Sequence, residues 1–88
     1  MKIKEGYLLR KIADTHIVVP TEGRVIEFKG MMVLNSVSAK IWEFMTVDRK
    51  YDEIINFVLS TYEIDHQTAS RDLNVLLEKM KDNGVLAQ

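Results

Sequence analysis

The sequence predicts an α+β fold of the winged-helix type, in which an N-terminal antiparallel β-meander is followed by three α-helices. Two observations predict it. β-Branched and aromatic residues form short runs before residue 35, separated by turn residues. From residue 36 onward, apolar residues recur at helical spacing. The chain has 88 residues, enough for one hydrophobic core, so we expect one domain over residues 1–88.

Three to four short strands are expected within residues 7–34. The strand candidates are residues 7–12, 16–20, 24–28 and 31–34, and turns are expected at Asp14-Thr15 and at residues 21–23. Lys29-Gly30 is compatible with a hairpin turn and with a glycine bulge in one longer strand, and the sequence leaves both open. The connections are too short for parallel crossovers, so the strands should be antiparallel.

Apolar stripes place the three helices at residues 36–45, 51–62 and 66–83. Asn35 or Ser36 can cap the first helix, and Asp65 can cap the third. Gly84 is a suitable stop for the third helix. We expect Val85 and Leu86, which follow this glycine, to return to the core.

Composition argues against an enzyme. The chain has no cysteine, which excludes disulfides and thiolate metal sites. His16 and His66 lie far apart in the sequence without metal-ligand spacing, so no metal site is expected. No known catalytic or phosphate-binding motif is present. We therefore predict a binding module without catalytic residues or a cofactor.

The charge distribution argues against a nucleic-acid partner. Residues 1–50 carry nine basic and six acidic side chains, a net charge of +3. Residues 51–88 carry three basic and seven acidic side chains, a net charge of −4, although a reading helix normally carries a basic stripe. No apolar run is long enough to span a membrane or to form a signal-peptide core. The expected location is the cytoplasm.

The run at residues 31–34 is apolar on both faces of its predicted strand. Met32 and Leu34 share one face, and Met31 and Val33 share the other. Two interpretations remain open. The strand is central and buried on both faces, or it is an edge strand whose second apolar face is presented to a visiting peptide.

Val75 lies on the third predicted helix, about 140° from the centre of its apolar stripe. Its neighbours on that side are Thr68, Arg71, Asp72 and Lys79. A single exposed valine is common in proteins. Beside a strand edge, however, it would form one wall of a groove suited to an extended peptide.

Several short motifs occur in a recognisable order along the chain. They are Val33-Leu34-Asn35, Ser38-Ala39, Ile41-Trp42, residues 51–55, Asp72-Leu73, Leu76-Leu77 and Gly84-Val85-Leu86. Over residues 7–86 this order resembles the PqqD-like peptide chaperones, also called RiPP recognition elements. The chain differs from the common family pattern at Ser38, where glycine is frequent, and in the connector at residues 46–50.

The resemblance implies a function. Such domains bind the leader segment of a ribosomally made precursor peptide as an added antiparallel strand, beside the third strand and the third helix. They present it to a maturase, often a radical SAM enzyme, in the synthesis of pyrroloquinoline quinone or of another peptide product. Carried over by position, the peptide-binding residues are Phe28, Lys29, Met31, Val33, Thr68, Arg71, Asp72 and Val75.

Two other functions are compatible with parts of the sequence. The first is a winged-helix nucleic-acid-binding protein that reads bases with polar residues of the third helix, namely His66, Gln67, Thr68, Ser70, Arg71 and Asn74. The acidic balance of residues 51–88 disfavours it. The second is a structural subunit that forms a homodimer through the same strand edge.

Overall fold

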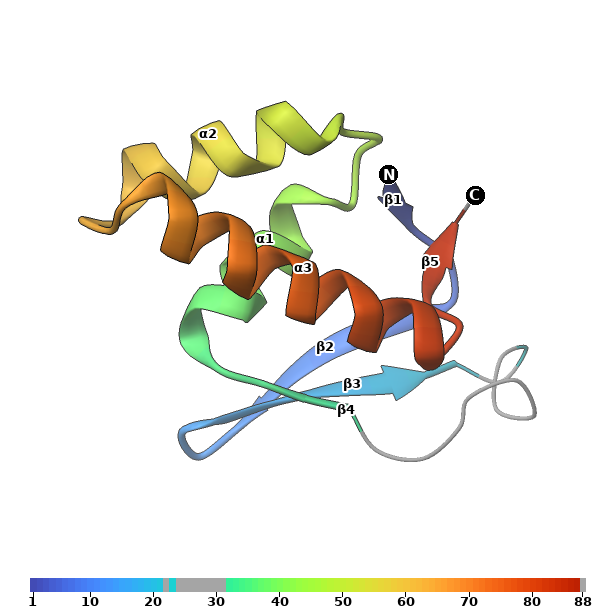
Figure 1. Cartoon of the computed structure of the whole chain (residues 1–88). Coiled ribbons are helices and arrows are strands. Elements are labelled where there is room, and N and C mark those ends of the chain that lie inside the picture. Colours follow the sequence, from blue (N-terminus) through green and yellow to red (C-terminus); the bar gives the residue numbers. More distant parts are fainter. Residues whose placement is uncertain (22, 24–31, 88) are drawn as a thin grey trace.

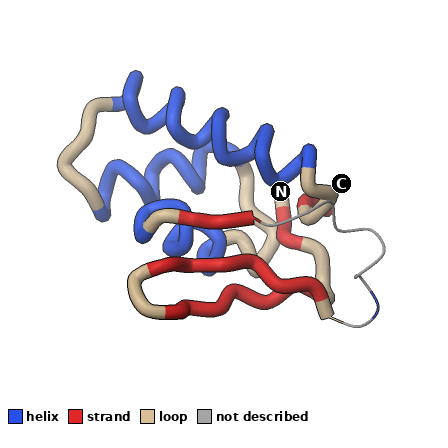
Figure 2. The backbone as a smooth tube through the Cα atoms, turned by 90° about the horizontal axis from the view of Figure 1, so that it is seen from below, coloured by secondary structure: helices blue, strands red, loops and turns tan. Residues whose placement is uncertain are grey.

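The computed structural model describes residues 1–21, 23 and 32–87. It has the predicted α+β class, with antiparallel strands followed by three helices (Figure 1). The helices lie over one side of a three-stranded sheet, and the two chain ends lie beside each other (Figure 2). The sequence prediction of the fold class is therefore confirmed.

The three-stranded sheet has the order β2-β3-β4 and is antiparallel throughout. Its strands are β2 (Tyr7–Ile12), β3 (Thr15–Pro20) and β4 (Met32–Leu34). The turn between β2 and β3 is Ala13-Asp14, one residue earlier than predicted, because Thr15 already pairs with Ile12. Ala13 has φ 56°, the positive sign that a type II′ turn requires at its first central position.

Some of the strand predictions lie outside the described residues. These are the strand at 24–28, the choice between turn and bulge at Lys29-Gly30, and part of the turn at 21–23.

Strand β4 is at the edge of the sheet formed by the described strands. Met32 and Leu34 are buried, whereas the Val33 side chain, on the opposite face, is 42% exposed. This alternation is that of a strand with one face on the core and one face toward solvent. Of the two interpretations left open by the sequence, the described residues therefore fit the edge strand.

The helices are α1 (Ser36–Phe44), α2 (Tyr51–Thr61) and α3 (His66–Asp82). Asn35, rather than Ser36, caps α1, since its Oδ1 accepts a hydrogen bond of 2.8 Å from the Ser38 N–H. The Asp65 Oδ1 accepts from the Thr68 N–H at 2.7 Å and caps α3 as predicted. Both caps satisfy backbone donors that have no partner within the helix.

A single hydrophobic core joins all of these elements. It includes side chains from the sheet, from every helix and from the segment after α3, among them Val18, Met32, Leu34, Trp42, Met45, Ile54, Leu73, Met80 and Val85. Buried side chains of this kind supply most of the free energy that favours folding.

The end of α3 turns the chain back to the core. Gly84 has φ 71°, and the Val85 N–H donates to the Met80 carbonyl at 3.1 Å while the Gly84 N–H donates to that of Lys81. These two bonds define a Schellman motif, in which glycine adopts the left-handed conformation without strain. Val85 is fully buried beyond it.

A second, two-stranded sheet was not predicted from the sequence. Strands β1 (Lys2–Ile3) and β5 (Leu86–Ala87) pair antiparallel and bring the two ends of the chain together. The N-terminal segment also contacts the end of α1 and the connector to α2, because the Ile3 N–H donates to the Met45 carbonyl and the Arg49 N–H donates to the Met1 carbonyl.

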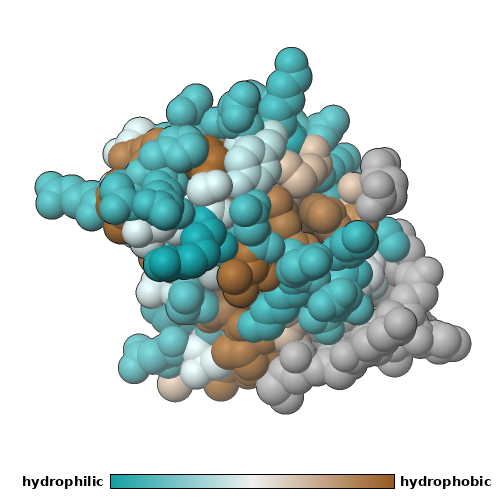
Figure 3. All heavy atoms as spheres, viewed as in Figure 1, coloured by the Kyte–Doolittle hydropathy of each residue, from teal (hydrophilic) through white to brown (hydrophobic). Residues whose placement is uncertain are grey.

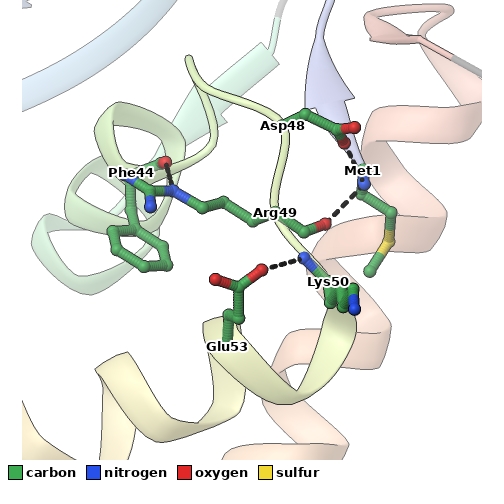
Figure 4. A network of polar contacts seen from close by, with 6 residues as sticks. All are labelled: Met1, Phe44, Asp48, Arg49, Lys50 and Glu53. Carbon is green, nitrogen blue, oxygen red and sulfur yellow. Dashed lines mark hydrogen bonds and ion pairs between the residues drawn. The ribbon is translucent and has the colours of Figure 1, made fainter.

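Polar contacts fix this connector (Figure 4). The Met1 ammonium donates to the Asp48 Oδ1 at 2.8 Å and to the Arg49 carbonyl. The Arg49 guanidinium donates to the Phe44 carbonyl at 2.9 Å and lies 4.0 Å from the centre of the Phe44 ring. At the start of α2, the Lys50 N–H donates to the Glu53 carboxylate at 2.8 Å. The connector thereby holds α2 at a defined position beside α1.

Packing of the core can be tested at Ile54, which is fully buried on α2. We expect Ile54→Ala to lower the free energy of unfolding by about 2–5 kcal/mol, because the cavity it leaves is not refilled. The conservative Ile54→Val should cost about 0.5–1.5 kcal/mol. Urea denaturation followed by circular dichroism measures both. A control substitution, Val47→Ala, removes an exposed side chain and should change the stability by less than about 0.5 kcal/mol.

The Asp65 cap predicts a pH dependence. Hydrogen bonds from the Thr68 side chain and from its N–H hold the pKa of Asp65 below its ordinary value. Because the pKa is lower in the folded state, the cap stabilises fully above the unfolded pKa and is lost as pH falls through the folded pKa. The Thr68 amide signal should follow this acidic transition in an NMR titration. In Asp65→Asn, which keeps an oxygen acceptor, the signal should be flat, and an identical profile in both proteins would contradict the assignment.

Candidate functional site: a groove between β4 and α3

A groove runs between the edge strand β4 and helix α3. It encloses about 380 Å³. Residues from β4, α1, the end of α2 and α3 line it, among them Val33, Val37, Ile41, Tyr62, Ile64, Asp72, Val75 and Lys79. Figure 3 shows apolar side chains gathered in the middle of this side of the molecule, with hydrophilic side chains around them.

Helix α3 supplies one wall of the groove. Its side toward the core is formed by Ala69, Leu73, Leu76 and Met80, all buried. Asp72, Val75 and Lys79 also line the groove, and their spacing of three and four residues places them on a common helix face. Val75 is 65% exposed, as counting of the helical faces indicated. The wall is therefore apolar at Val75, with the acidic Asp72 on one side of it and the basic Lys79 on the other.

The backbone of β4 supplies the opposite wall, and the register of the sheet shows which way its polar groups point. The Thr21 N–H donates to the Gly6 carbonyl at 2.7 Å, one pair beyond the end of the β2–β3 ladder. Bonded and non-bonded pairs alternate along an antiparallel ladder, so every second pair counted from Gly6 and Thr21 is bonded. The pair of Arg10 and Ile17 is one of these, so the polar groups of Ile17 point to β2. Val33 lies opposite Ile17 in a non-bonded pair, so its N–H and C=O point away from β3.

One side chain of α3 reaches this free edge. The Lys79 Nζ donates a hydrogen bond of 2.8 Å to the Val33 carbonyl. This contact agrees with the direction of the Val33 carbonyl deduced from the register. Helix α3 lies across the groove from β4, on the side away from β3, so a carbonyl that Lys79 reaches must point away from β3. The groove thus has a strand edge on one side and an amphipathic helix face on the other.

The structure brings together some of the residues that the sequence assigned to peptide binding. Val33, Asp72 and Val75 line the groove. Thr68 and Arg71 are not among the lining residues: the Thr68 N–H is engaged by the Asp65 cap, and the Arg71 Nε lies 3.8 Å from the Asp72 Oδ1 at the exposed surface. The remaining three, Phe28, Lys29 and Met31, lie outside the described residues.

Other lining residues were missed by sequence reasoning. Ile41 is buried on α1 and still borders the groove, and Tyr62 and Ile64 come from the end of α2 and the loop after it. Lys79 was recognised as a neighbour of Val75 on the helix, but no local pattern indicates a contact with a strand 46 residues away. Only the spatial arrangement of α2, α3 and β4 reveals these residues.

Two polar residues of α3 that could have read bases are already engaged within the protein. The Tyr51 hydroxyl is hydrogen-bonded to the Ser70 hydroxyl at 3.0 Å and donates to the Asn74 Oδ1 at 2.8 Å. These contacts hold α2 against α3. They reduce the number of side chains on α3 that are available for a DNA groove, which agrees with the acidic balance of residues 51–88.

The described residues form neither a metal-binding cluster nor a membrane-spanning helix. Within residues 1–21, 23 and 32–87, no group of three or more histidine, aspartate or glutamate side chains is arranged to hold a metal ion. Among the helices of the same part of the chain, none is both long enough and apolar enough to cross a membrane.

The fold and the groove define a small α+β domain that exposes a strand edge beside a helix. The sequence model of the family described as coenzyme PQQ synthesis protein D (PqqD) matches residues 15–86, and the chain belongs to this family. The resemblance stated from the sequence is thus confirmed. No curated protein matches the chain significantly.

Two solved structures share the fold. One is TbiB1 in complex with the TbiA(beta) leader peptide, with a TM-score of 0.73, 21% sequence identity and coverage of 100% of both chains. The other is a lasso peptide synthetase B1 complexed with the leader peptide, with a TM-score of 0.72 and 17% identity, covering 99% of this chain and 96% of that chain. At these identities the likeness establishes the fold.

The exposure of Val75 predicts that it contributes little to folding. Val75→Ala should change the free energy of unfolding by less than about 0.5 kcal/mol, because the side chain is mostly in water. The adjacent Leu76 is buried, and Leu76→Ala should cost about 2–5 kcal/mol. Chemical denaturation of the two variants makes the comparison. A large loss of stability in Val75→Ala would mean that the valine belongs to the core.

Proposed function

We propose that the domain is a non-catalytic peptide chaperone that binds the leader segment of a ribosomally synthesised precursor peptide. The leader adds to β4 as an antiparallel strand and lies in the groove beside α3. The observation that carries the proposal is the backbone of Val33, whose polar groups point into a groove with apolar walls. Membership of the PqqD family and the leader peptides bound to both structural neighbours support it.

The two walls have complementary tasks in this mode of binding. Backbone hydrogen bonds along β4 supply affinity that is independent of the peptide sequence, and pockets for alternate side chains supply selection. Val75 and Ile64, both exposed in the groove, offer apolar surface for such side chains, and Asp72 and Lys79 place charges beside it. Thr68, Arg71, Phe28, Lys29 and Met31 remain proposed contacts on the strength of the family resemblance.

The partner that receives the peptide is a modifying enzyme. We assign to this chain the task of presentation and to the maturase the chemistry, which in the PqqD-like family is often that of a radical SAM enzyme. Whether the product is pyrroloquinoline quinone or another modified peptide depends on the precursor that the groove accepts. Catalysis, metal binding and cofactor binding are not part of the proposed role.

Pairing of the β4 edge with a second copy of the chain is the competing use of the same surface. It would bury the Val33 face in a symmetric interface. Because both partners need the same backbone groups, a homodimer and a peptide complex exclude each other at this edge. Light scattering with and without peptide separates the two, since peptide binding to the proposed site leaves a complex with one copy of the chain.

The proposal predicts how the groove responds to a charge at Val75. We expect Val75→Asp to weaken binding of a cognate leader about tenfold or more, because it replaces an apolar contact by a carboxylate that must be desolvated. The test titrates ¹⁵N-labelled protein with synthetic leader segments of precursors encoded beside its gene. In the unmodified protein, amide signals of residues 32–34 and of the groove side of α3 should shift.

A matched control introduces the same charge elsewhere. Val47 is also exposed, lies in the connector between α1 and α2, and does not line the groove. Val47→Asp should bind the leader as tightly as the unmodified chain. Equal weakening in both variants, or binding that leaves residues 32–34 unperturbed, would refute the proposed site.

A further inference from the structure

Lys79 occupies the backbone position that an added strand would use. Its ammonium donates at 2.8 Å to the Val33 carbonyl, which points to the free edge of β4. The acceptor of a strand-addition site is therefore already engaged in the free protein. An incoming peptide N–H would take this carbonyl in place of the ammonium, while the Val33 N–H, which also points to the free edge, donates to a peptide carbonyl.

The choice of partner by Lys79 is unusual for its surroundings. Asp82 lies three residues further along the same helix, a spacing at which acid–base pairs commonly form, and Glu78 directly precedes Lys79 without sharing its face. Within the described residues, neither carboxylate forms an ion pair with Lys79, which instead crosses the groove to a neutral carbonyl. Once displaced, its ammonium has no described carboxylate bound to it and would stand beside the peptide.

We propose that Lys79 is a gate for the strand edge that also selects the peptide. In the free protein its ammonium occupies the Val33 carbonyl by a hydrogen bond. When a leader strand adds, a peptide N–H takes that carbonyl, and the released ammonium binds a carboxylate of the leader. The favoured ligands are thus extended peptides with an aspartate or glutamate at the position that passes Lys79, and this inference rests on the proposed function.

Selection should be confined to one place along the peptide. Asp72 lines the same groove seven residues earlier on α3, which corresponds to about 10 Å along the helix axis. Its carboxylate repels an acidic side chain at that end of the groove. General acidity of the peptide is therefore insufficient, and the acid has to lie at the Lys79 end.

The contact itself can be tested without any peptide. In Lys79→Met, which keeps the length and apolar stem of the side chain, the carbonyl ¹³C signal of Val33 should shift. Lys81 is the matched control, because it is exposed in the same last turn of α3 and does not line the groove. Lys81→Met should leave the Val33 signal in place. An unchanged Val33 signal in Lys79→Met would overturn the gate.

Selection is tested with acetylated and amidated twelve-residue peptides in which leucine or isoleucine alternates with threonine. One threonine or apolar residue at a time is replaced by glutamate and, in a twin peptide, by glutamine. With the full chain we expect one position at which glutamate binds about five- to tenfold more tightly than glutamine, as a charge-assisted hydrogen bond provides. In Lys79→Met this preference should fall below about twofold, and in Lys81→Met it should persist.

The gate also predicts an effect on peptides without an acid. Lys79→Met should bind the glutamine twins at least as tightly as the unmodified protein, because no ammonium has to be displaced. If peptides bind and shift residues 32–34 but show no glutamate preference, or keep it in Lys79→Met, the selective role of Lys79 is refuted while the proposed function stands. If no peptide of the panel and no leader segment perturbs residues 32–34, both are refuted.

Discussion

Burial of Met32 and Leu34 is the constraint on which the rest of the structure depends. These two side chains anchor a strand of three described residues to the helices, with almost no surface left in water. Side-chain direction and hydrogen-bond direction alternate together along a strand, so burying this pair also fixes the backbone of Val33. Its polar groups then point across the groove. The core and the edge of the site are thus set by the same two residues.

Helix α3 packs on the core with one face and lines the groove with another. Its buried stripe fixes it against the core, and the Tyr51 contacts to Ser70 and Asn74 fix it to α2. The Asp65 cap defines where it begins, and the Schellman motif at Gly84 defines where it ends. With both ends and the inner side fixed, Asp72, Val75 and Lys79 are presented at a constant distance from β4.

Much of this arrangement could be predicted from the sequence, because the relevant signals are local. Helical periodicity and capping residues such as Asp65 identify α1, α2 and α3, and the wheel of α3 places Val75 opposite the core. The same counting identified the two faces of the strand around Met32. These signals depend on spacing within a few residues, which is where sequence patterns carry most information.

The features that escaped prediction depend on contacts between distant residues. Strands β1 and β5 have two residues each, too few for any alternation to show, and they exist because the Schellman motif returns Val85 to the core beside the N-terminal strand. The turn between β2 and β3 was predicted, but one residue late, because its first position is Ala13 rather than the glycine or asparagine that usually marks a positive φ. The Lys79–Val33 contact joins two elements across the groove, and its partner is a backbone carbonyl, which every residue type provides.

The direction of the Val33 backbone also determines how a bound strand would be read. Residues paired across an antiparallel ladder have their side chains on the same face of the sheet. A ligand residue bonded to Val33 would therefore point outward, as Val33 does, and both of its neighbours would point under α3. Recognition would then have a period of two residues, in which anchoring side chains alternate with positions that are free to vary. Leaders of quite different sequence could share this period and fit the same groove.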